Sequence, residues 1–278
     1  FVPFIALAPG VNLPPGQLLP RINGSRPRVS EYIYDGISVL QPEPGQVAYF
    51  PVIDAIDEFR VEANAYAAEY GRANGGIILV NQKSGTNQFR GALFEFFRHE
   101  RLNARNFFAN PAQPKPRFRR NQYGFIFGGP LRRNRTFFFT DWQGTRQQTG
   151  IVRISTVPTL AQREGRFTTP IFDPANNRQP FPANTIPLSR FDSTARSLLD
   201  RYPVPTSPAT ANNFRRTGNE LISQDQFDTR LDHYLGSAHR FFARYAFLRD
   251  FSQPISPLPD GSGNLTAGII GDTLTRAD

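Results

Sequence analysis

The sequence predicts a mainly β fold with a small α/β module, and three observations support this prediction. The 278 residues include 26 phenylalanines and one tryptophan, and aromatic residues make up 13% of a chain that is only 39% hydrophobic. The chain also contains 22 glycines and 25 prolines, which favours strands joined by turns and long loops over a helical bundle. Beyond Phe89, apolar and polar residues alternate with the period of two that is typical of β-strands.

Residues 1–87 alternate short apolar runs with turns, as a small mixed α/β module does. The segment YIYDGISV, Tyr32–Val39, predicts a short strand that ends in an Asp-Gly turn. The spacing of apolar residues in 52–61 predicts one or two helical turns before a short strand. Residues 65–70 predict a further helical turn, capped by Gly71.

A buried strand is predicted at GGIILVNQ, where the apolar run Ile77–Val80 is flanked by glycines and by turn residues. Gly71, Gly75 and Gly76 precede this run, and Gly85 lies in the turn that follows it. We expect Gly71, Gly75 and Gly76 to allow a positive φ or a close approach of backbones at little steric cost, and Gly85 to turn the chain toward the strands that follow.

Five segments beyond residue 87 have the alternation of strands of about ten residues each. They are 88–99, 121–130, 135–146, 223–235 and 239–250. The short connections Pro130–Arg135 and Gly236–His239 alternate with the long connections Glu100–Arg120 and Gln147–Ile222. Strands with an apolar face, short turns at one end and long loops at the other end are typical of a transmembrane β-barrel wall.

The second face of the last two segments is charged. Asp228, Arg230 and Asp232 alternate with apolar residues in one segment, and Arg244 does so in the other. A β-sandwich is the commoner explanation of a single alternating strand, but such charges do not suit its dry core. They suit a water-filled lumen, so we expect these four side chains to face the lumen of a transmembrane β-barrel whose wall includes the five predicted antiparallel strands.

The long connection contains one further signal, in PLSRFDSTARSLLDRYPVP. Ser189, with Asp192 three residues later, predicts a capped amphipathic helix of about three turns that stops before Pro203. We expect this helix to fold over the loop, in preference to binding a partner.

Several segments resemble those of one family, over nearly the whole chain. They are FVPFIALAPGV, INGSRPRVSEYIYDGISV, DAIDEFRVEANAYAAEYGRANGGIILVNQKSGTNQFRG, NQYGFIFGGPLRRNRTFFFTDWQG, PFPANTIPLSRFDSTARSLLDRYPVP and DQFDTRLDHYLGSAHRFFARYAF. The chain resembles the TonB-dependent outer-membrane transporters, and within them the Oar-like group, which often carries an N-terminal carboxypeptidase-regulatory-like domain. The resemblance is most specific in residues 54–142.

The resemblance implies a plug domain inside a 22-stranded barrel. Residues 1–87 correspond to most of the plug, whose turns hold the four glycines, and residues 88–278 to the N-terminal strands and long extracellular loops of the incomplete barrel. The implied location is the outer membrane of a Gram-negative bacterium. The implied function is to bind a ligand outside the cell and to import it, driven by the TonB–ExbB–ExbD complex through an N-terminal segment that is missing here. We therefore expect the chain to be a piece of a longer precursor.

No residue pattern predicts an enzyme, a cofactor site or a metal site. The chain has no cysteine, which excludes disulfides and thiolate ligands within it. Lys83-Ser84 lacks the glycine spacing of a phosphate-binding loop, and KSGT occurs without the S-x-x-K of β-lactamase-like enzymes. His99, His233 and His239 are too far apart in the sequence to predict a metal site.

The net charge is +9, and all but two of the basic residues are arginines. Because the arginines are scattered, nucleic-acid binding by an Arg/Phe-rich RNA-binding protein is the weakest alternative. A secreted or surface adhesin, or a sugar-binding β-sandwich, is the other. For a transporter, the candidate contacts to a ligand or to lipopolysaccharide phosphates are the arginines of the first long loop. They are Arg101, Arg105, Arg117, Arg119 and Arg120. The sequence does not identify the substrate.

Overall fold

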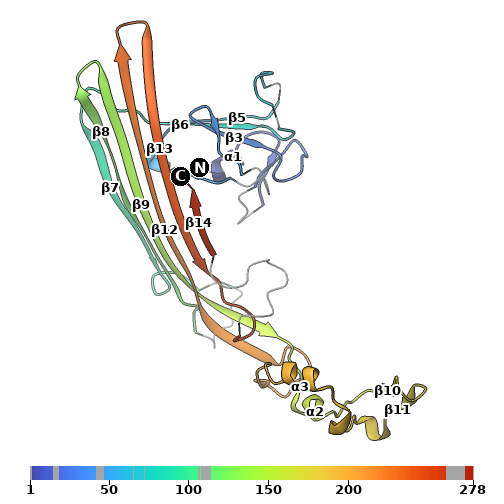
Figure 1. The fold of residues 1–278 in the computed structure, drawn as a ribbon. Helices are drawn as coiled ribbons and strands as arrows, with labels where there is room; N and C mark the ends of the chain where they lie inside the picture. The colour runs from blue at the N-terminus through green and yellow to red at the C-terminus, as the bar shows by residue number, and fades with distance from the viewer. Residues whose placement is uncertain are drawn as a thin grey trace.

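The chain folds into a long, curved antiparallel sheet with a small N-terminal module against its concave side (Figure 1). The computed structural model describes residues 2–14, 19–41, 47–64, 66–71, 73–105, 107, 114–260 and 273–277. We call the face of the long sheet that contacts the N-terminal module the inner face, and the opposite face the outer face.

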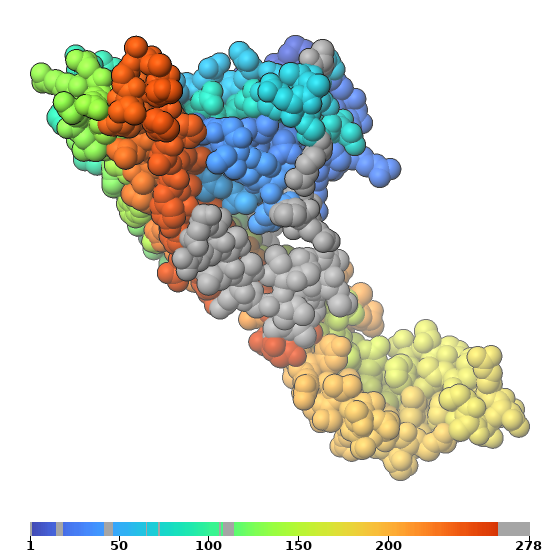
Figure 2. Space-filling model, turned by 45° about the horizontal axis from the view of Figure 1, so that its top comes forward, coloured from blue at the N-terminus to red at the C-terminus, as the bar shows by residue number. Residues whose placement is uncertain are grey.

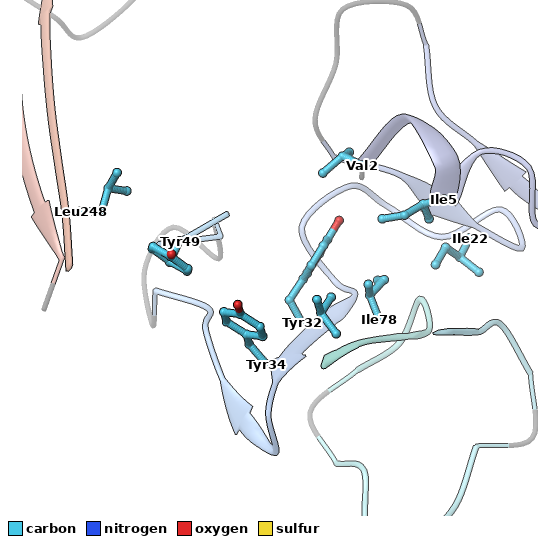
Figure 3. Packing of buried hydrophobic residues seen from close by; sticks show 9 residues of the cluster. Val2, Ile5, Ile22, Tyr32, Tyr34, Tyr49, Ile78 and Leu248 are labelled. Carbon is cyan, nitrogen blue, oxygen red and sulfur yellow. The ribbon is translucent and has the colours of Figure 1, made fainter. Parts of the chain in front are cut away.

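The N-terminal module is built on a four-stranded mixed sheet of order β4-β3-β6-β5, with β3 and β6 parallel. Its elements are α1 (Val2–Ile5), β1 (Val11–Asn12), β2 (Arg21–Ile22), β3 (Glu31–Tyr34), β4 (Ile37–Ser38), η1 (Ile53–Ala55), β5 (Ile56–Glu62) and β6 (Ile77–Gln82). The core gathers Ile5, Ile22, Tyr32, Tyr34 and Ile78, all at most 3% exposed (Figure 3). The predicted buried strand is therefore confirmed as β6.

The prediction of one or two helical turns before a short strand in residues 52–61 is confirmed in part: η1, a single 3-10 turn, precedes the seven-residue strand β5. The further helical turn predicted at residues 65–70 is wrong, because residues 66–71 contain a turn but no helix. The register of β5 on β6 shifts between Ile56 and Glu58. This irregularity breaks the strict alternation of the strand, which is why its apolar spacing resembles that of a helix.

The long sheet has the strand order β14-β13-β12-β9-β8-β7, with every neighbouring pair antiparallel. The strands are β7 (Arg90–His99), β8 (Phe118–Arg132), β9 (Thr136–Ser155), β12 (Phe214–Leu235), β13 (His239–Gln253) and β14 (Thr273–Ala277). The five predicted strands are β7, β8, β9, β12 and β13, and β14 adds a sixth. Within the described residues the sheet stays open, with β7 and β14 at its two ends.

The strands β9 and β12 are about twice as long as the sequence predicts, at 20 and 22 residues. Their apolar alternation stops near Gln147 and Ile222, but the paired strands continue to Ser155 and Phe214. Cross-strand ion pairs join the two strands, with Arg146 at 2.8 Å from Asp225 at the edge of the predicted segments and Arg153 at 2.8 Å from Glu220 beyond them. In the added part of β9 the apolar residues Ile151 and Val152 are adjacent, and the added part of β12 is mostly polar, so neither part shows the alternation that predicts a strand.

The connection between β9 and β12 folds into a loop module at the opposite end of the sheet from the N-terminal module, as Figures 1 and 2 both show. It holds α2 (Leu160–Arg163), β10 (Phe172–Asp173), β11 (Gln179–Pro180), η2 (Pro182–Asn184), η3 (Leu188–Arg190) and α3 (Ser193–Leu199). The predicted helix is confirmed as α3, which ends before Pro203, but it begins at Ser193 and is shorter than the three turns predicted from Ser189. Asp192 is extended at ψ 132° and caps only the seven-residue α3, where its carboxylate accepts the N–H of Ala195 at 2.9 Å.

The outer face of the long sheet is apolar and exposed. Leu93, Phe125, Trp142, Phe227 and Phe247 lie directly opposite one another across five strands. On the same face, Leu231 is 43% exposed, Phe241 59% and Tyr245 50%. These side chains are not sealed in a core, which contradicts the alternative of a soluble β-sandwich. Among the described residues, no helix is both long and apolar enough to cross a membrane.

Candidate functional site

Three carboxylates of the inner face are buried under the N-terminal module. Asp141 on β9 and Asp228 on β12 are 0% exposed, and Asp232 on β12 is 1% exposed. Asp141 and Asp228 lie directly opposite each other, as do Arg230 and Arg244. The alternation of β12 therefore turns a row of charges away from the outer apolar face and toward the module.

Arg230 joins the sheet to the N-terminal module. It donates from Nε to Asp232 at 3.0 Å, and from Nη1 to Asp35 of the module at 3.1 Å and to the backbone carbonyl of Gln82 at 3.4 Å. Asp35 follows β3 in the left-handed conformation, with φ 47°, and its carboxylate also accepts the N–H of Gln82 at 3.0 Å. The Asp-Gly turn thus places a carboxylate where the arginine reaches it.

Arg244 on β13 makes the second connection. Its Nη2 donates to Asp228 at 2.8 Å, and its guanidinium lies 3.4 Å from the ring centroid of Tyr34. The Tyr34 ring stacks on that of Tyr49 at 5.9 Å, and the Tyr49 hydroxyl donates to Asp228. Two tyrosines of the module therefore enclose one arginine and one aspartate of the sheet.

Asp141 completes the cluster and is the least well paired of its carboxylates. Its Oδ2 accepts from Nε2 of Gln82 at 3.1 Å, whereas its Oδ1 has no hydrogen-bond partner among the described residues. We call the group formed by Asp35, Gln82, Tyr34, Tyr49, Asp141, Asp228, Arg230, Asp232 and Arg244 the charge cluster.

The charge cluster fixes the position of the module more than it adds to stability. Replacing a whole buried ion-pair network by apolar residues is often neutral, because desolvation offsets the Coulomb attraction. Removing one partner costs about 3–5 kcal/mol, because it leaves an uncompensated buried charge. The interface therefore disfavours small displacements that separate partners, and it tolerates a full separation in which water reaches both sides.

Apolar contacts flank the charge cluster on both sides. Val52 and Ala55 of the module pack on Phe139 of β9, with Phe94 and Ile126 beside them. Leu248 of β13 joins the core of the module next to Tyr49 (Figure 3). The same inner face therefore contacts the module through side chains from β7, β8, β9, β12 and β13.

The chain passes from the module to the sheet through a tight junction at Gly85. A Cβ on Gly85 would lie 2.7 Å from the carbonyl oxygen of Gly129 and 2.9 Å from the backbone N of Phe138, and closer still to the Phe138 carbonyl. Asn87 and Asn134 then exchange two hydrogen bonds of 2.7 Å, which fix the junction to the β8–β9 turn.

The other three predicted glycines differ from one another. Gly76 has φ 121°, and a Cβ on Gly75 would lie 2.7 Å from the hydroxyl of Ser25. Gly71 has no positive φ, and no described atom lies within 4 Å of the position of its Cβ. The structure thus gives no steric reason for a glycine at Gly71.

The candidate arginines of the first long loop do not share one face. Arg120 lies on the inner face, where it donates to Gln122 at 3.0 Å, and its neighbour Arg119 lies on the outer face. Arg101, Arg105 and Arg117 are exposed beyond the strand ends. Among the described residues, no three His, Cys, Asp or Glu side chains come together as a metal site requires.

Sequence reasoning found the four charged residues of the sheet but missed their partners in the module. Asp35 was identified only as a turn residue, and Tyr34, Tyr49 and Gln82 carried no functional signal. The contact between Asp35 and Arg230 joins residues 195 positions apart. One feature of the sequence could have indicated these partners. Charged residues on a strand face that a module covers are buried, and buried charges need partners, which the module must then supply.

The hydroxyl of Tyr49 allows one contact of the charge cluster to be tested alone. Tyr49→Phe keeps the ring stack and removes only the bond to Asp228, so we expect the module–sheet association to weaken by about 1.5–3 kcal/mol. Tyr32→Phe is the matched control, because the buried Tyr32 hydroxyl has no hydrogen-bond partner among the described residues. Urea unfolding of the purified protein measures both variants. Equal stability of the two would show that the Tyr49 hydroxyl contributes nothing.

The chain is similar in sequence to outer-membrane proteins. Residues 81–273 match the family model described as "Outer membrane beta barrel domain". A segment of 73 residues, 26% of this chain, is 34% identical to the TonB-dependent transporter Oar of Myxococcus xanthus, and the match spans 7% of the length of that protein. No solved structure matches the chain.

Proposed function

Because the chain belongs to the outer membrane β-barrel domain family, we propose that it is part of a TonB-dependent transporter that binds a ligand outside the cell and imports it. In this proposal, residues 1–87 form most of a plug, and residues 88–278 form the first strands and long extracellular loops of the barrel. The observation that carries it is the burial of the inner-face charges Asp141, Asp228 and Asp232 beneath the N-terminal module.

The two faces of the sheet suit the two environments of a barrel wall. The outer face presents exposed apolar side chains, as lipid contact requires, and the inner face presents charges and amides. The long loop module lies at one end of the strands, and the short turns 133–135 and 236–238 lie at the other end (Figure 1). We assign the loop end to the cell exterior and the turn end to the periplasm.

Opening requires the plug to leave the wall, and the charge cluster sets how this happens. A pull on an N-terminal segment by the TonB–ExbB–ExbD complex would have to separate Arg230 from Asp35, and Arg244 from Tyr34, together. Water entering the gap would then solvate both sides, so that separation becomes reversible. In this proposal, the interface keeps the plug against the wall at rest, and a pulling force can still separate the two.

The arginines of the first long loop divide between two proposed roles, contact with lipopolysaccharide and contact with the ligand. Arg119 lies on the outer face near the loop end of β8, and Arg117 lies next to it, so that both are placed to meet lipopolysaccharide phosphates in the outer leaflet. Arg120 faces inward and is proposed to contact ligand in the lumen.

Occlusion of a pore by the N-terminal module can be tested without knowing the ligand. We expect cells that make the whole protein without residues 2–80 to become sensitive to vancomycin, which is too large to cross an intact outer membrane. Cells making the complete protein should remain resistant. The double variant Arg230→Ala/Arg244→Ala, which keeps the module but loosens it, should give intermediate sensitivity.

Heat-modifiable migration on a gel shows that each protein is folded in the outer membrane. Resistance of cells that carry a folded, module-deleted barrel would contradict the proposal, because the barrel would then have no pore for the module to close.

A further inference from the structure

The loop module between β9 and β12 contains a pocket of about 930 Å³, which lies within the size range of small-molecule sites. Its lining residues belong to the β10–β11 hairpin and the segment after it, and this hairpin lies at the opposite end of the sheet from the N-terminal module (Figure 1). Its apolar walls include Phe172, Phe181 and Ile186, and its charged lining consists of Asp173, Arg178 and Arg190. Phe172 is 56% exposed, so a large apolar surface stays open at its rim.

One side of the pocket is held in place by a fixed ion pair. Arg190 donates to both carboxylate oxygens of Asp173 at 2.9 Å, and its guanidinium lies 5.9 Å from the ring centroid of Phe181. The Asp173 carboxylate, 5% exposed, also accepts the N–H of Ala175 at 3.0 Å. The hydrogen bonds from Arg190 hold the pKa of Asp173 below its usual range, so the pair stays ionised at neutral pH. Arg190 is thereby largely neutralised.

Arg178 is the charge that this arrangement leaves uncompensated. Its side chain is exposed and has no hydrogen-bond or ion-pair partner among the described residues. Its backbone is left-handed, with φ 55°, as is that of Asn177, in a turn closed by the hydrogen bond from the N–H of Gln179 to the carbonyl of Asn176 at 2.8 Å. Glycine, asparagine or aspartate is preferred where both central residues of a turn are left-handed, so an arginine here carries backbone strain. The turn therefore places a free guanidinium at the pocket at a cost that glycine would avoid.

From these features we infer that the hairpin pocket binds a small organic anion with an aromatic or aliphatic body. The anionic group contacts Arg178, because the other two charges of the lining neutralise each other. The body of the ligand packs on Phe172 and Phe181. That this anion is also the transported ligand rests on the proposed function, whereas the binding itself does not.

Two probes with the same phenyl body and headgroups of opposite charge test the inference on the purified whole protein. Saturation-transfer NMR is expected to show 4-phenylbutyrate bound and 4-phenylbutylamine unbound. Arg178→Gln should weaken the binding of 4-phenylbutyrate about tenfold, since a charge-assisted hydrogen bond is lost. Arg201→Gln makes the same charge change elsewhere in the loop module, on an exposed residue outside the pocket, and should leave binding unchanged.

Arg178→Gly separates a ligand-binding role from a structural role. Glycine relaxes the left-handed turn, so this variant is expected to resist protease in the loop at least as well as the wild type and still to lose binding. Binding of 4-phenylbutyrate that is undetectable in the wild type, equal in Arg178→Gln, or matched by 4-phenylbutylamine would overturn the inference. Binding of the anion by a protein without a pore would instead contradict the proposed transport and leave the pocket assignment intact.

Discussion

Replacing Arg244 with alanine is expected to release the N-terminal module from the long sheet while the sheet itself stays folded. The guanidinium of Arg244 compensates Asp228, which is 0% exposed, and lies against Tyr34 of the module. Without it, the buried carboxylate keeps only the Tyr49 hydroxyl as a partner in the module. Leaving a buried charge uncompensated costs about 3–5 kcal/mol, and hydration of Asp228 recovers this energy only if the module moves away.

The release of the module can be measured by labelling an introduced cysteine, because the chain itself contains no cysteine. Ala55→Cys places a thiol at a site that is 0% exposed, between the module and Phe139. We expect its modification by a maleimide to be about 100-fold faster in the Arg244→Ala background, since 3 kcal/mol corresponds to that shift in the population of the open state.

Arg249→Ala is the matched control for Arg244→Ala, because Arg249 lies on the same strand with its side chain exposed and on the outer face. It should leave the rate of modification unchanged. An unchanged rate in Arg244→Ala as well would mean that the charge cluster does not hold the module.

Gly85→Val is expected to prevent the module and the sheet from assembling correctly. Its side chain would collide with backbone atoms of Phe138 and Gly129, on β9 and β8. Backbone in a paired sheet cannot move aside as a flexible side chain can, so we expect a loss of about 3 kcal/mol or more. The yield of heat-modifiable, folded protein in the outer membrane should fall accordingly.

Gly71→Ala is the control for the glycine prediction, because no described atom lies near the position of its Cβ and its φ is not positive. We expect a change in stability within about 0.5 kcal/mol. A Gly85→Val protein that folds as well as Gly71→Ala would show that the close approach at the junction is not required.

The sheet was predictable from the sequence because its signal is local. The alternation around Phe227 and Phe241 separates apolar from charged residues within a few positions, and it places Asp228, Arg230, Asp232 and Arg244 on one face. The short turns 133–135 and 236–238 fall where the sequence predicts turns. These features depend only on neighbours along the chain.

The parts that were missed depend on contacts between distant residues. The ends of β9 and β12 lack a regular apolar alternation and are joined by the cross-strand ion pair Arg153–Glu220, which neither strand reveals by itself. The strand β5 begins as early as Ile56 because it pairs with β6, although the apolar spacing of Val52, Ile56 and Phe59 favours helical turns there. Asp35 joins the charge cluster only once the module docks on the sheet.

A spin-label scan along β13 in lipid vesicles tests the central claim most directly, namely that the outer face of the long sheet contacts lipid and the inner face does not. Labels at Phe241, Ala243 and Tyr245 should collide often with dissolved oxygen, which concentrates in lipid, and labels at Phe242 and Ala246 should collide rarely. This alternation with period two is the result that we predict. Uniform collision along the strand, or high oxygen accessibility at the inner positions alone, would contradict the assignment of this sheet as a membrane wall.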